Sequence, residues 1–141
     1  MLALLCTGVF AGAAIYVTLV EHPARMECGP ALAIAQFGPS YRRAAVMQAA
    51  LAAIGCLAAV GAWVQGRGAI ALAAGLLLGA AIPFTLIAVL PTNKRLLDPA
   101  LVLDSGEAVR LLARWGRLHA VRTVSSAVAF VLLALDLARA G

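Results

Sequence analysis

Residues 69–90 read AIALAAGLLLGAAIPFTLIAVL and contain no charged side chain. About 20 consecutive apolar residues suffice for a helix to cross the hydrocarbon layer of a bilayer, which is about 30 Å thick. The stretch therefore predicts a transmembrane helix. Pro83 should bend this helix, because proline lacks the N–H that would bond the carbonyl of Gly79 and its ring clashes with the preceding turn.

Three other stretches of the chain are similarly apolar. Hydrophobic residues make up 64% of the chain, charged residues 12%, and the mean hydropathy is +1.00. A water-soluble domain of this size avoids such extensive apolar surface. We predict an all-α integral membrane protein, a single domain over residues 1–141, folded as an up-down four-helix bundle. The expected spans are about 2–20, 44–64, 69–90 and 107–137.

The last of these spans is longer than a bilayer is thick, so only about 120–135 should lie in hydrocarbon. Asp104 is expected to cap this helix, with Glu107 in its first turn. Two pairs of small residues, Gly8-x-x-x-Gly12 and Gly75-x-x-x-Gly79, predict close helix contacts, because packing drives helix association in lipid.

The basic residues give a formal net charge of +5, but they lie between the apolar stretches and not among aromatic residues, so nucleic-acid binding is not expected. Most of them flank the first and third connections: Arg25, Arg42, Arg43, Lys94, Arg95, Arg110, Arg114 and Arg117. Only Arg67 and Arg139 belong to the opposite end. Because cytoplasmic loops are rich in Lys and Arg, we expect both termini outside and connections one and three in the cytoplasm, in a bacterial inner membrane.

No basic residue precedes Arg25, so the first stretch lacks the start of a cleaved signal peptide and is expected to remain in the mature protein. The three cysteines, Cys6, Cys28 and Cys56, form no C-x-x-C pair. They are expected to be packing residues, because free cysteine behaves as a small hydrophobe.

Three polar motifs should meet at the basic end of the bundle. Glu21-His22-Pro23-Ala24-Arg25 follows the first span, Pro91-Thr92-Asn93-Lys94-Arg95-Leu96 follows the third, and Trp115-x-x-x-His119-x-x-Arg122 lies on the fourth. In an up-down bundle these three places are on the same side. Tyr41, at the start of the second span, is expected at the same level, as a headgroup anchor and a ligand contact.

Trp115, His119, Arg122 and Ser126 share one helix face, because their spacing follows the helical repeat. Arg122 should lie about one turn inside the membrane, where an ionised side chain costs ~2.5–3.5 kcal/mol unless it is paired or hydrated. Glu21, an asparagine carbonyl or an anionic ligand would offset that cost. Alternatively, Arg122, Glu21 and Asn93 only tie the helices together, while His22 and His119 bond loop carbonyls.

No metal site is expected, because the two histidines lack a cysteine or carboxylate at ligand spacing. A haem held between His22 and His119 is a weaker alternative, since the two residues lie on different helices near the interface.

In their order and placement these motifs resemble the anthrone-oxygenase-like family of small four-helix membrane proteins. The resemblance covers nearly the whole chain. It implies a cofactor-independent monooxygenase that converts an anthrone to the anthraquinone with dioxygen. A base would remove a proton from the activated methylene, and the resulting anion would pass an electron to dioxygen.

On this resemblance His119 is the general base, because imidazole works near neutral pH, and His22 is the competing base. Arg122 and Asn93 would stabilise the developing oxyanion. Trp115 would stack on a flat substrate, with Glu21 and Tyr41 as further substrate contacts.

Three functional hypotheses follow. The first is a membrane oxygenase or oxidase of a hydrophobic aromatic, with membrane lipid and that small molecule as partners and no bound cofactor. The second is a non-catalytic subunit that binds a second copy of the chain or another membrane protein. The third, haem or metal electron transfer, would be visible in the absorbance of the purified protein.

Overall fold

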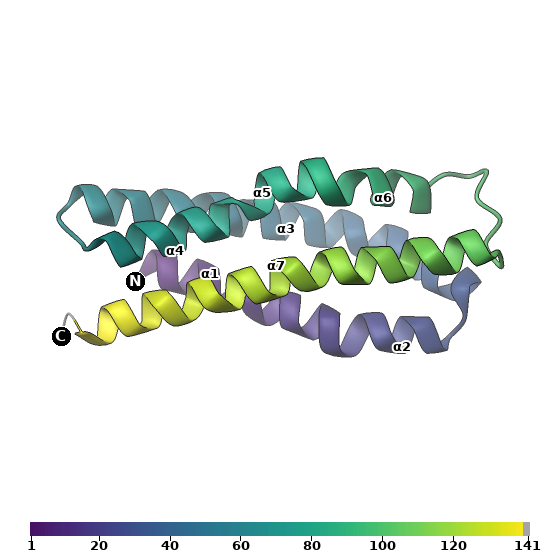
Figure 1. Cartoon of the computed structure of the whole chain (residues 1–141), viewed down its shortest axis with the longest axis horizontal. Helices are drawn as coiled ribbons and strands as arrows, with labels where there is room; N and C mark the ends of the chain where they lie inside the picture. The colour runs from purple at the N-terminus through teal and green to yellow at the C-terminus, as the bar shows by residue number, and fades with distance from the viewer. Residues whose placement is uncertain (140–141) are drawn as a thin grey trace.

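The computed structural model describes residues 1–139, which fold into four long helices joined by short connections (Figure 1). Each helix is long and apolar enough to cross a membrane: Leu2–Glu27, Pro30–Val64, Ala69–Leu96 and Gly106–Arg139. The predicted all-α four-helix bundle is confirmed over this part of the chain. The last two residues of the expected domain, 140–141, lie outside the described residues.

The first and third long helices each contain several elements. The first consists of α1 (Leu2–Tyr16), the π-helical η1 (Val17–Glu21) and α2 (His22–Glu27), and the second is α3 (Pro30–Val64). The third consists of α4 (Ala69–Gly79), α5 (Ala81–Phe84), the π-helical η2 (Thr85–Val89) and α6 (Leu90–Leu96), and the fourth is α7 (Gly106–Arg139).

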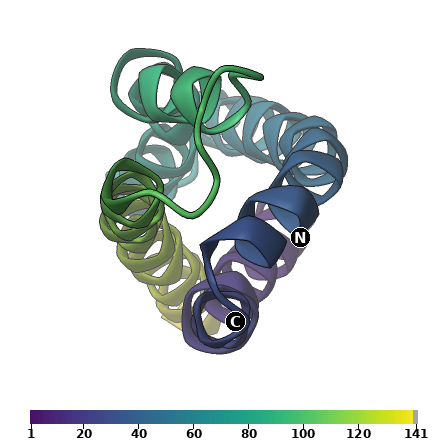
Figure 2. The ribbon, with the colours of Figure 1, turned by 90° about the vertical axis from the view of Figure 1, so that its right-hand side faces the viewer.

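The long helices stand at the corners of a square, which the end-on view shows (Figure 2), and successive helices run in opposite directions (Figure 1). α1 packs against α3 and α7, and α4 packs against the same two helices. The N-terminus, the last turn of α7 and the connection at 65–68 lie at one end, and the connections after α2 and α6 lie at the other (Figure 1). The three polar motifs therefore meet at one end of the bundle.

The helices are longer than the spans expected from hydropathy. The first and third helices continue to Glu27 and Leu96 through their polar motifs, and the second begins at Pro30 instead of residue 44. Proline is well tolerated in the first turn of a helix, and Gly29, with φ of 82°, reverses the chain just before it. With 35 residues, α3 is about 50 Å long. Hydropathy identified only the part that fits in hydrocarbon.

Proline also explains the irregular turns. α4 ends at Gly79, whose carbonyl has no donor from Pro83, and the ribbon is offset between α4 and α5 as the sequence predicted (Figure 1). The two π-helical turns, η1 and η2, each end two residues before a proline, Pro23 and Pro91. Such turns widen a helix and are frequent at functional sites.

Small residues bring α4 close to α3 in the half of the bundle that contains both chain ends, here called the lower half (Figure 1). A Cβ on Gly75 would overlap the side chain of Ala59, and one on Gly79 would lie 2.7 Å from Cys56 Sγ. This confirms the close contact predicted for that pair. Of the other pair, a Cβ on Gly8 would lie 3.0 Å from the ring of Phe130, whereas one on Gly12 would meet no atom of another part of the structure within 4 Å.

The other half, called the upper half, ends at the connections after α2 and α6 (Figure 1) and has a second core. This core extends beyond the spans expected from hydropathy. Its larger buried members are Phe37, Leu96, Leu112 and Trp115. Two clusters of buried hydrophobic side chains thus stack along the bundle, one Ala-rich and one with aromatic residues.

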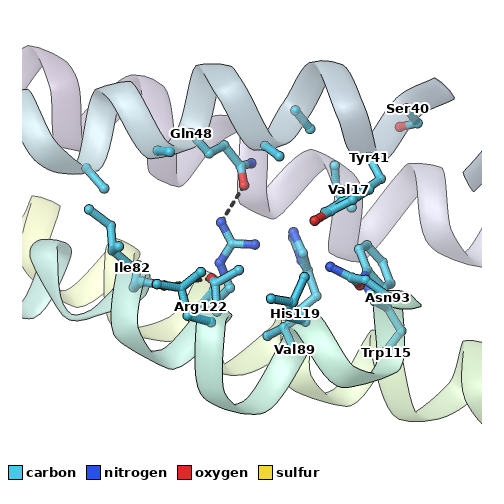
Figure 3. A pocket seen from close by; sticks show the side chains of 18 of the residues that line it. Val17, Ser40, Tyr41, Gln48, Ile82, Val89, Asn93, Trp115, His119 and Arg122 are labelled. Atoms are coloured by element: carbon cyan, nitrogen blue, oxygen red, sulfur yellow. Dashed lines mark hydrogen bonds between the residues drawn. The ribbon is translucent and has the colours of Figure 1, made fainter. Parts of the chain in front are cut away.

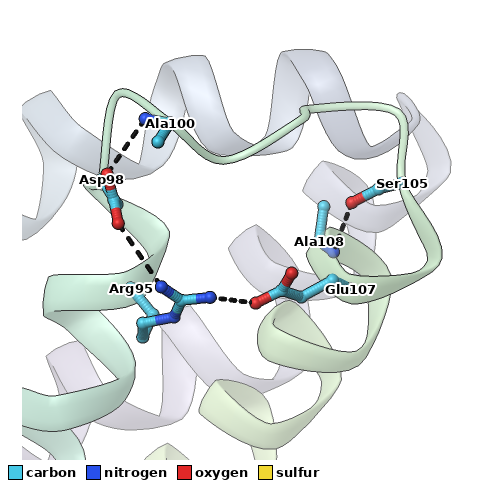
Figure 4. A network of polar contacts seen from close by, with 6 residues as sticks. All are labelled: Arg95, Asp98, Ala100, Ser105, Glu107 and Ala108. Atoms are coloured by element: carbon cyan, nitrogen blue, oxygen red, sulfur yellow. Dashed lines mark hydrogen bonds and ion pairs between the residues drawn. The ribbon is translucent and has the colours of Figure 1, made fainter.

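The start of α7 is fixed by polar contacts (Figure 4). Ser105 Oγ accepts a hydrogen bond from the backbone N–H of Ala108 at 3.1 Å. Ser105, and not the predicted Asp104, is therefore the cap, because only the residue directly before the first turn can reach that amide. Glu107 pairs with Arg95, which also contacts Asp98 at 3.4 Å and so joins α6 to α7.

Candidate functional site

A cavity of ≈190 Å³ lies between the two cores, and all four long helices contribute to its wall (Figure 3). Its polar lining consists of Arg25, Ser40, Tyr41, Gln48, Thr85, Asn93, Trp115, His119 and Arg122, and its remaining lining side chains are hydrophobic. An empty apolar cavity of about 150 Å³ is enough to bind benzene. This cavity can therefore hold at least one aromatic ring beside a polar end.

His119 is buried on α7 and belongs to a chain of hydrogen bonds with α1 and η1. Its Nδ1 lies 3.0 Å from Thr18 Oγ1, which lies 2.7 Å from Thr123 Oγ1. Thr123 Oγ1 is within 3.1 Å of the carbonyl of Ala14 and 3.2 Å of the carbonyl of His119 itself. The ring is therefore held by one of its two nitrogens.

The direction of donation along these hydrogen bonds decides which nitrogen of His119 carries the proton. If Thr123 donates to a carbonyl, Thr18 donates to Thr123 and His119 Nδ1–H donates to Thr18, which makes three hydrogen bonds. In the reverse order Thr123 donates to Thr18 and Thr18 donates to Nδ1, which makes only two. The first order is favoured, because each hydrogen bond in a poorly solvated site adds stability. It leaves the lone pair on Nε2 available to a ligand.

Arg122 lies one turn further along α7 and has no acidic partner. Its Nη2 donates to Gln48 Oε1 at 2.6 Å, and its guanidinium lies 5.4 Å from the centre of the Phe10 ring. The ion pairs found in residues 1–139 are Arg25–Glu21, Arg95–Asp98 and Arg95–Glu107. Neutral groups thus surround the Arg122 charge, so the cavity favours an anion.

Glu21 is not the partner of Arg122. Its Oε1 accepts hydrogen bonds from Arg25, from Gln36 at 2.9 Å and from Ser40 at 2.8 Å. Arg25 is itself 6% exposed and lies over the rings of Phe37 and Trp115. The Glu21–Arg25 pair thus connects α2 to α3, and its arginine is part of the cavity wall.

Two more side chains bring unpaired polar groups to the cavity wall. Asn93 is 1% exposed, and neither its Oδ1 nor its Nδ2 has a hydrogen-bond partner in the described part of the chain. The indole N–H of Trp115 is likewise buried without a partner. Since buried polar groups are almost always paired, these atoms are suited to bind a polar group of a ligand.

Five of the seven predicted site residues come together on the cavity wall: Tyr41, Asn93, Trp115, His119 and Arg122. Glu21 and His22 do not line it. His22 instead packs on Trp115, with ring centres 5.2 Å apart, and against Gly116, where a Cβ would lie 2.5 Å from its Nε2. It lines a second hollow, between the first helix and α7.

The arrangement does not support a haem between the two histidines. Both imidazoles pack on the indole of Trp115, with ring centres 5.2 Å and 4.8 Å away, and His119 Nδ1 is engaged by Thr18. No cluster of three or more His, Cys, Asp or Glu side chains that could hold a metal is found among residues 1–139.

Several site residues were missed by the sequence interpretation. Gln48 is an amide inside an apolar span, a signal that could have revealed it, because buried polar groups in membrane helices need partners. Arg25 was placed in the first polar motif and among the loop cations, but not among the candidate site residues. Thr18 and Thr123 gave no signal, because threonine is common in membrane helices and often bonds its own backbone.

Four membrane-compatible helices around a polar-ended cavity define the class of this protein. A family model described as "Anthrone oxygenase" matches residues 37–132. The chain belongs to the anthrone oxygenase family. No curated protein and no solved structure matches it. The matched residues include Asn93, Trp115, His119 and Arg122, whereas Glu21, His22 and Arg25 precede them.

Proposed function

We propose that this chain is a membrane-embedded oxygenase or oxidase of a hydrophobic aromatic compound, such as an anthrone or phenol, and that it works without a bound cofactor. The observation that carries the proposal is the joint placement of His119 and Arg122 on one largely apolar cavity. A base and an uncompensated cation side by side can generate and hold an anion where water would not.

The reaction begins with proton transfer. His119 Nε2 takes one proton from the activated methylene of the substrate, and the negative charge moves to the ring oxygen. Arg122 and the Asn93 amide donate hydrogen bonds to that oxygen, while Trp115 contacts the flat ring. Binding in this form lowers the cost of ionising a weak carbon acid.

The anion then reacts with dioxygen directly. It transfers one electron, and the resulting superoxide and carbon radical combine to form a C–O bond. The protonated His119 returns its proton to give a hydroperoxide. Loss of the second C–H proton breaks the O–O bond, so that a carbonyl forms and hydroxide leaves as water. One methylene and one dioxygen give one carbonyl and one water, and no outside reductant is needed.

In this proposal the chain lies in the inner membrane of a bacterium, with both termini outside and the connections at 28–29 and 97–105 in the cytoplasm. Its partners are membrane lipid and the hydrophobic substrate. Contact with a second copy or another membrane protein would occur through the exposed apolar helix faces.

The test uses the purified protein in nanodiscs with a dihydroxyanthrone as substrate. Formation of the anthraquinone is followed by absorbance and dioxygen uptake by electrode, with heat-denatured protein as the control for spontaneous oxidation. With ¹⁸O₂, the new carbonyl should carry the label. His119→Gln should lower turnover by about 100-fold or more, as expected for loss of a general base, with the melting temperature kept.

The proposal fails if the native protein oxidises anthrones and phenols no faster than the denatured control. If, in addition, His119→Gln lowers the melting temperature strongly, the polar cluster holds the helices together and the non-catalytic subunit is the better description.

A further inference from the structure

Among the residues that line the cavity, all of which belong to the described part of the chain, two are exposed to the exterior of the bundle. Ala49 of α3 and Leu86 of η2 both line the cavity, and both are exposed, Leu86 by 59%. Ala45, half-buried, also lines this side. Because the same side chains face the cavity and the exterior, the opening lies between α3 and η2.

The helix interruption creates this opening. Along α4 the third helix lies tightly on α3, through Gly75 and Gly79. Beyond the break at Ala80 and Pro83, η2 and α6 pack on α7 instead. Alanines on α3 face the place where the third helix has moved away, and their small side chains leave it unfilled.

The opening faces the hydrocarbon layer. Arg42 and Arg43 are exposed directly before the alanines of α3, and Lys94 and Arg95 are exposed one turn after η2. Such residues mark the headgroup level. On the other side of that level, the exposed large side chains of α3 and η2 are apolar, Met47 and Ile87 among them.

The upper end of the cavity, in contrast, is lined by side chains that are buried or half-buried. Phe37, Leu112 and Trp115 are all at most 6% exposed and form the core above it. Arg25, paired with Glu21, lines the same end and is buried. The second hollow, between the first helix and α7, reaches His119 from its other side but is not lined by Arg122 or Asn93. The exposed edge that leads to those two residues is the one at Ala49 and Leu86.

Building on the proposed function, we propose that the gap between Ala45, Ala49 and Leu86 is a lateral entrance through which a neutral phenolic ring passes from the bilayer into the cavity. An apolar ring crosses this gap without desolvation cost, whereas a phenolate would not dissolve in the hydrocarbon. The ring ionises only after its oxygen reaches Arg122 and Asn93. The substrate class is therefore a lipid-soluble phenol or anthrone whose apolar substituents remain toward the lipid.

The experiment follows a bromophenol with an alkyl tail, because bromine quenches tryptophan fluorescence only on contact and Trp115 lines the cavity. All variants carry Trp63→Phe, which removes the other tryptophan, 46% exposed. The full chain is placed in nanodiscs, and the rate of quenching is measured after rapid mixing. A sulfonated bromophenol, confined to water, serves as the second probe.

Ala45→Phe and Ala49→Phe should each slow quenching by the alkyl bromophenol by about tenfold or more, since a blocked route lowers the association rate. The matched control is Ala50→Phe, also exposed on α3 but not part of the cavity lining. It should leave the rate unchanged. The sulfonated probe should not quench Trp115 in the wild type.

Equal rates in the Ala49→Phe and Ala50→Phe variants would overturn the lateral entrance, as would rapid quenching by the sulfonated probe. Either result would leave the proposed function standing, because the cavity would still bind a phenol by another route. Absence of quenching by both probes in the wild type would overturn the proposed function together with its entrance.

Discussion

At the scale of single residues, the cavity combines groups that are costly to bury. Within residues 1–139, the Arg122 guanidinium contacts a neutral amide and an aromatic ring, and neither polar atom of the Asn93 amide has a hydrogen-bond partner. A bundle selected for stability alone would place apolar side chains at such positions. Binding of an anionic, oxygen-bearing ligand gives both residues a role that packing does not.

The first prediction concerns the charge of Arg122. Replacing the pair together, Gln48→Leu with Arg122→Met, removes a buried cation and leaves no amide unpaired. We expect the melting temperature to stay or rise, because apolar residues often replace buried charges without loss of stability. Turnover of a dihydroxyanthrone should fall to the level of denatured protein. A marked drop in melting temperature would instead show that this pair holds α3 and α7 together.

The second prediction concerns the tautomer of His119. With ¹⁵N-labelled histidine, NMR of the wild type should show a protonated Nδ1 and an unprotonated Nε2, because Nδ1 donates to Thr18. Thr18→Val removes the acceptor and should shift the ring toward the Nε2–H tautomer, whereas Thr18→Ser should restore the wild-type signal. A wild-type spectrum with protonated Nε2 would reverse the proton order inferred from the hydrogen-bond distances.

Which site residues could be predicted from sequence follows from their chemistry. Trp115, His119 and Arg122 were found because their spacing places them on one face, and Asn93 because its motif follows an apolar span. Spacing within one helix could not show that Arg122 would reach Gln48 on another. Nor could it show that His22 would turn away toward Gly116, since that depends on the rotation of two helices about their axes.

At the scale of elements, the two parts of the third long helix pack differently. Its lower part, α4, lies close to α3 through glycine, and its upper part, from α5 to α6, leaves room for the cavity. The break at Ala80, three residues before Pro83, separates the two. Hydropathy predicted that this span exists, and Pro83 predicted a bend in it. Neither predicted its extension to Leu96 or the direction of the upper part, which depends on packing against α7.

The third prediction tests the close contact of α3 and α4. In Gly75→Ala the new methyl group overlaps Ala59, so the helices must separate, and we expect a loss of about 1–3 kcal/mol in stability. Gly12→Ala is the matched control, because a Cβ there meets nothing within 4 Å. It should be neutral or stabilising by up to about 1 kcal/mol, through helix propensity. Thermal unfolding in one detergent compares the two, and equal melting temperatures would contradict the packing described.

At the scale of the whole molecule, the bundle is longer than a membrane is thick, and its two ends differ in charge. At this scale one feature could be predicted from the sequence and one could not. The all-α bundle could be predicted because four long apolar stretches leave few alternatives in lipid. The helical extension at the basic end could not be predicted, because its polar motifs resemble loops in sequence. It depends on packing in the upper core, which includes Phe37 and Leu112.

The last prediction tests the orientation of the bundle. Cys28 is exposed at the basic end, whereas Cys6 is buried and Cys56 is half-buried within α3. Because basic connections stay in the cytoplasm, a membrane-impermeant maleimide should label Cys28 in inverted inner-membrane vesicles and not in intact cells. Cys28→Ser should abolish the label of this protein in the inverted vesicles, which would show that neither Cys6 nor Cys56 reacts. Labelling in intact cells and not in the vesicles would indicate the opposite orientation, with the polar end of the cavity at the outer face.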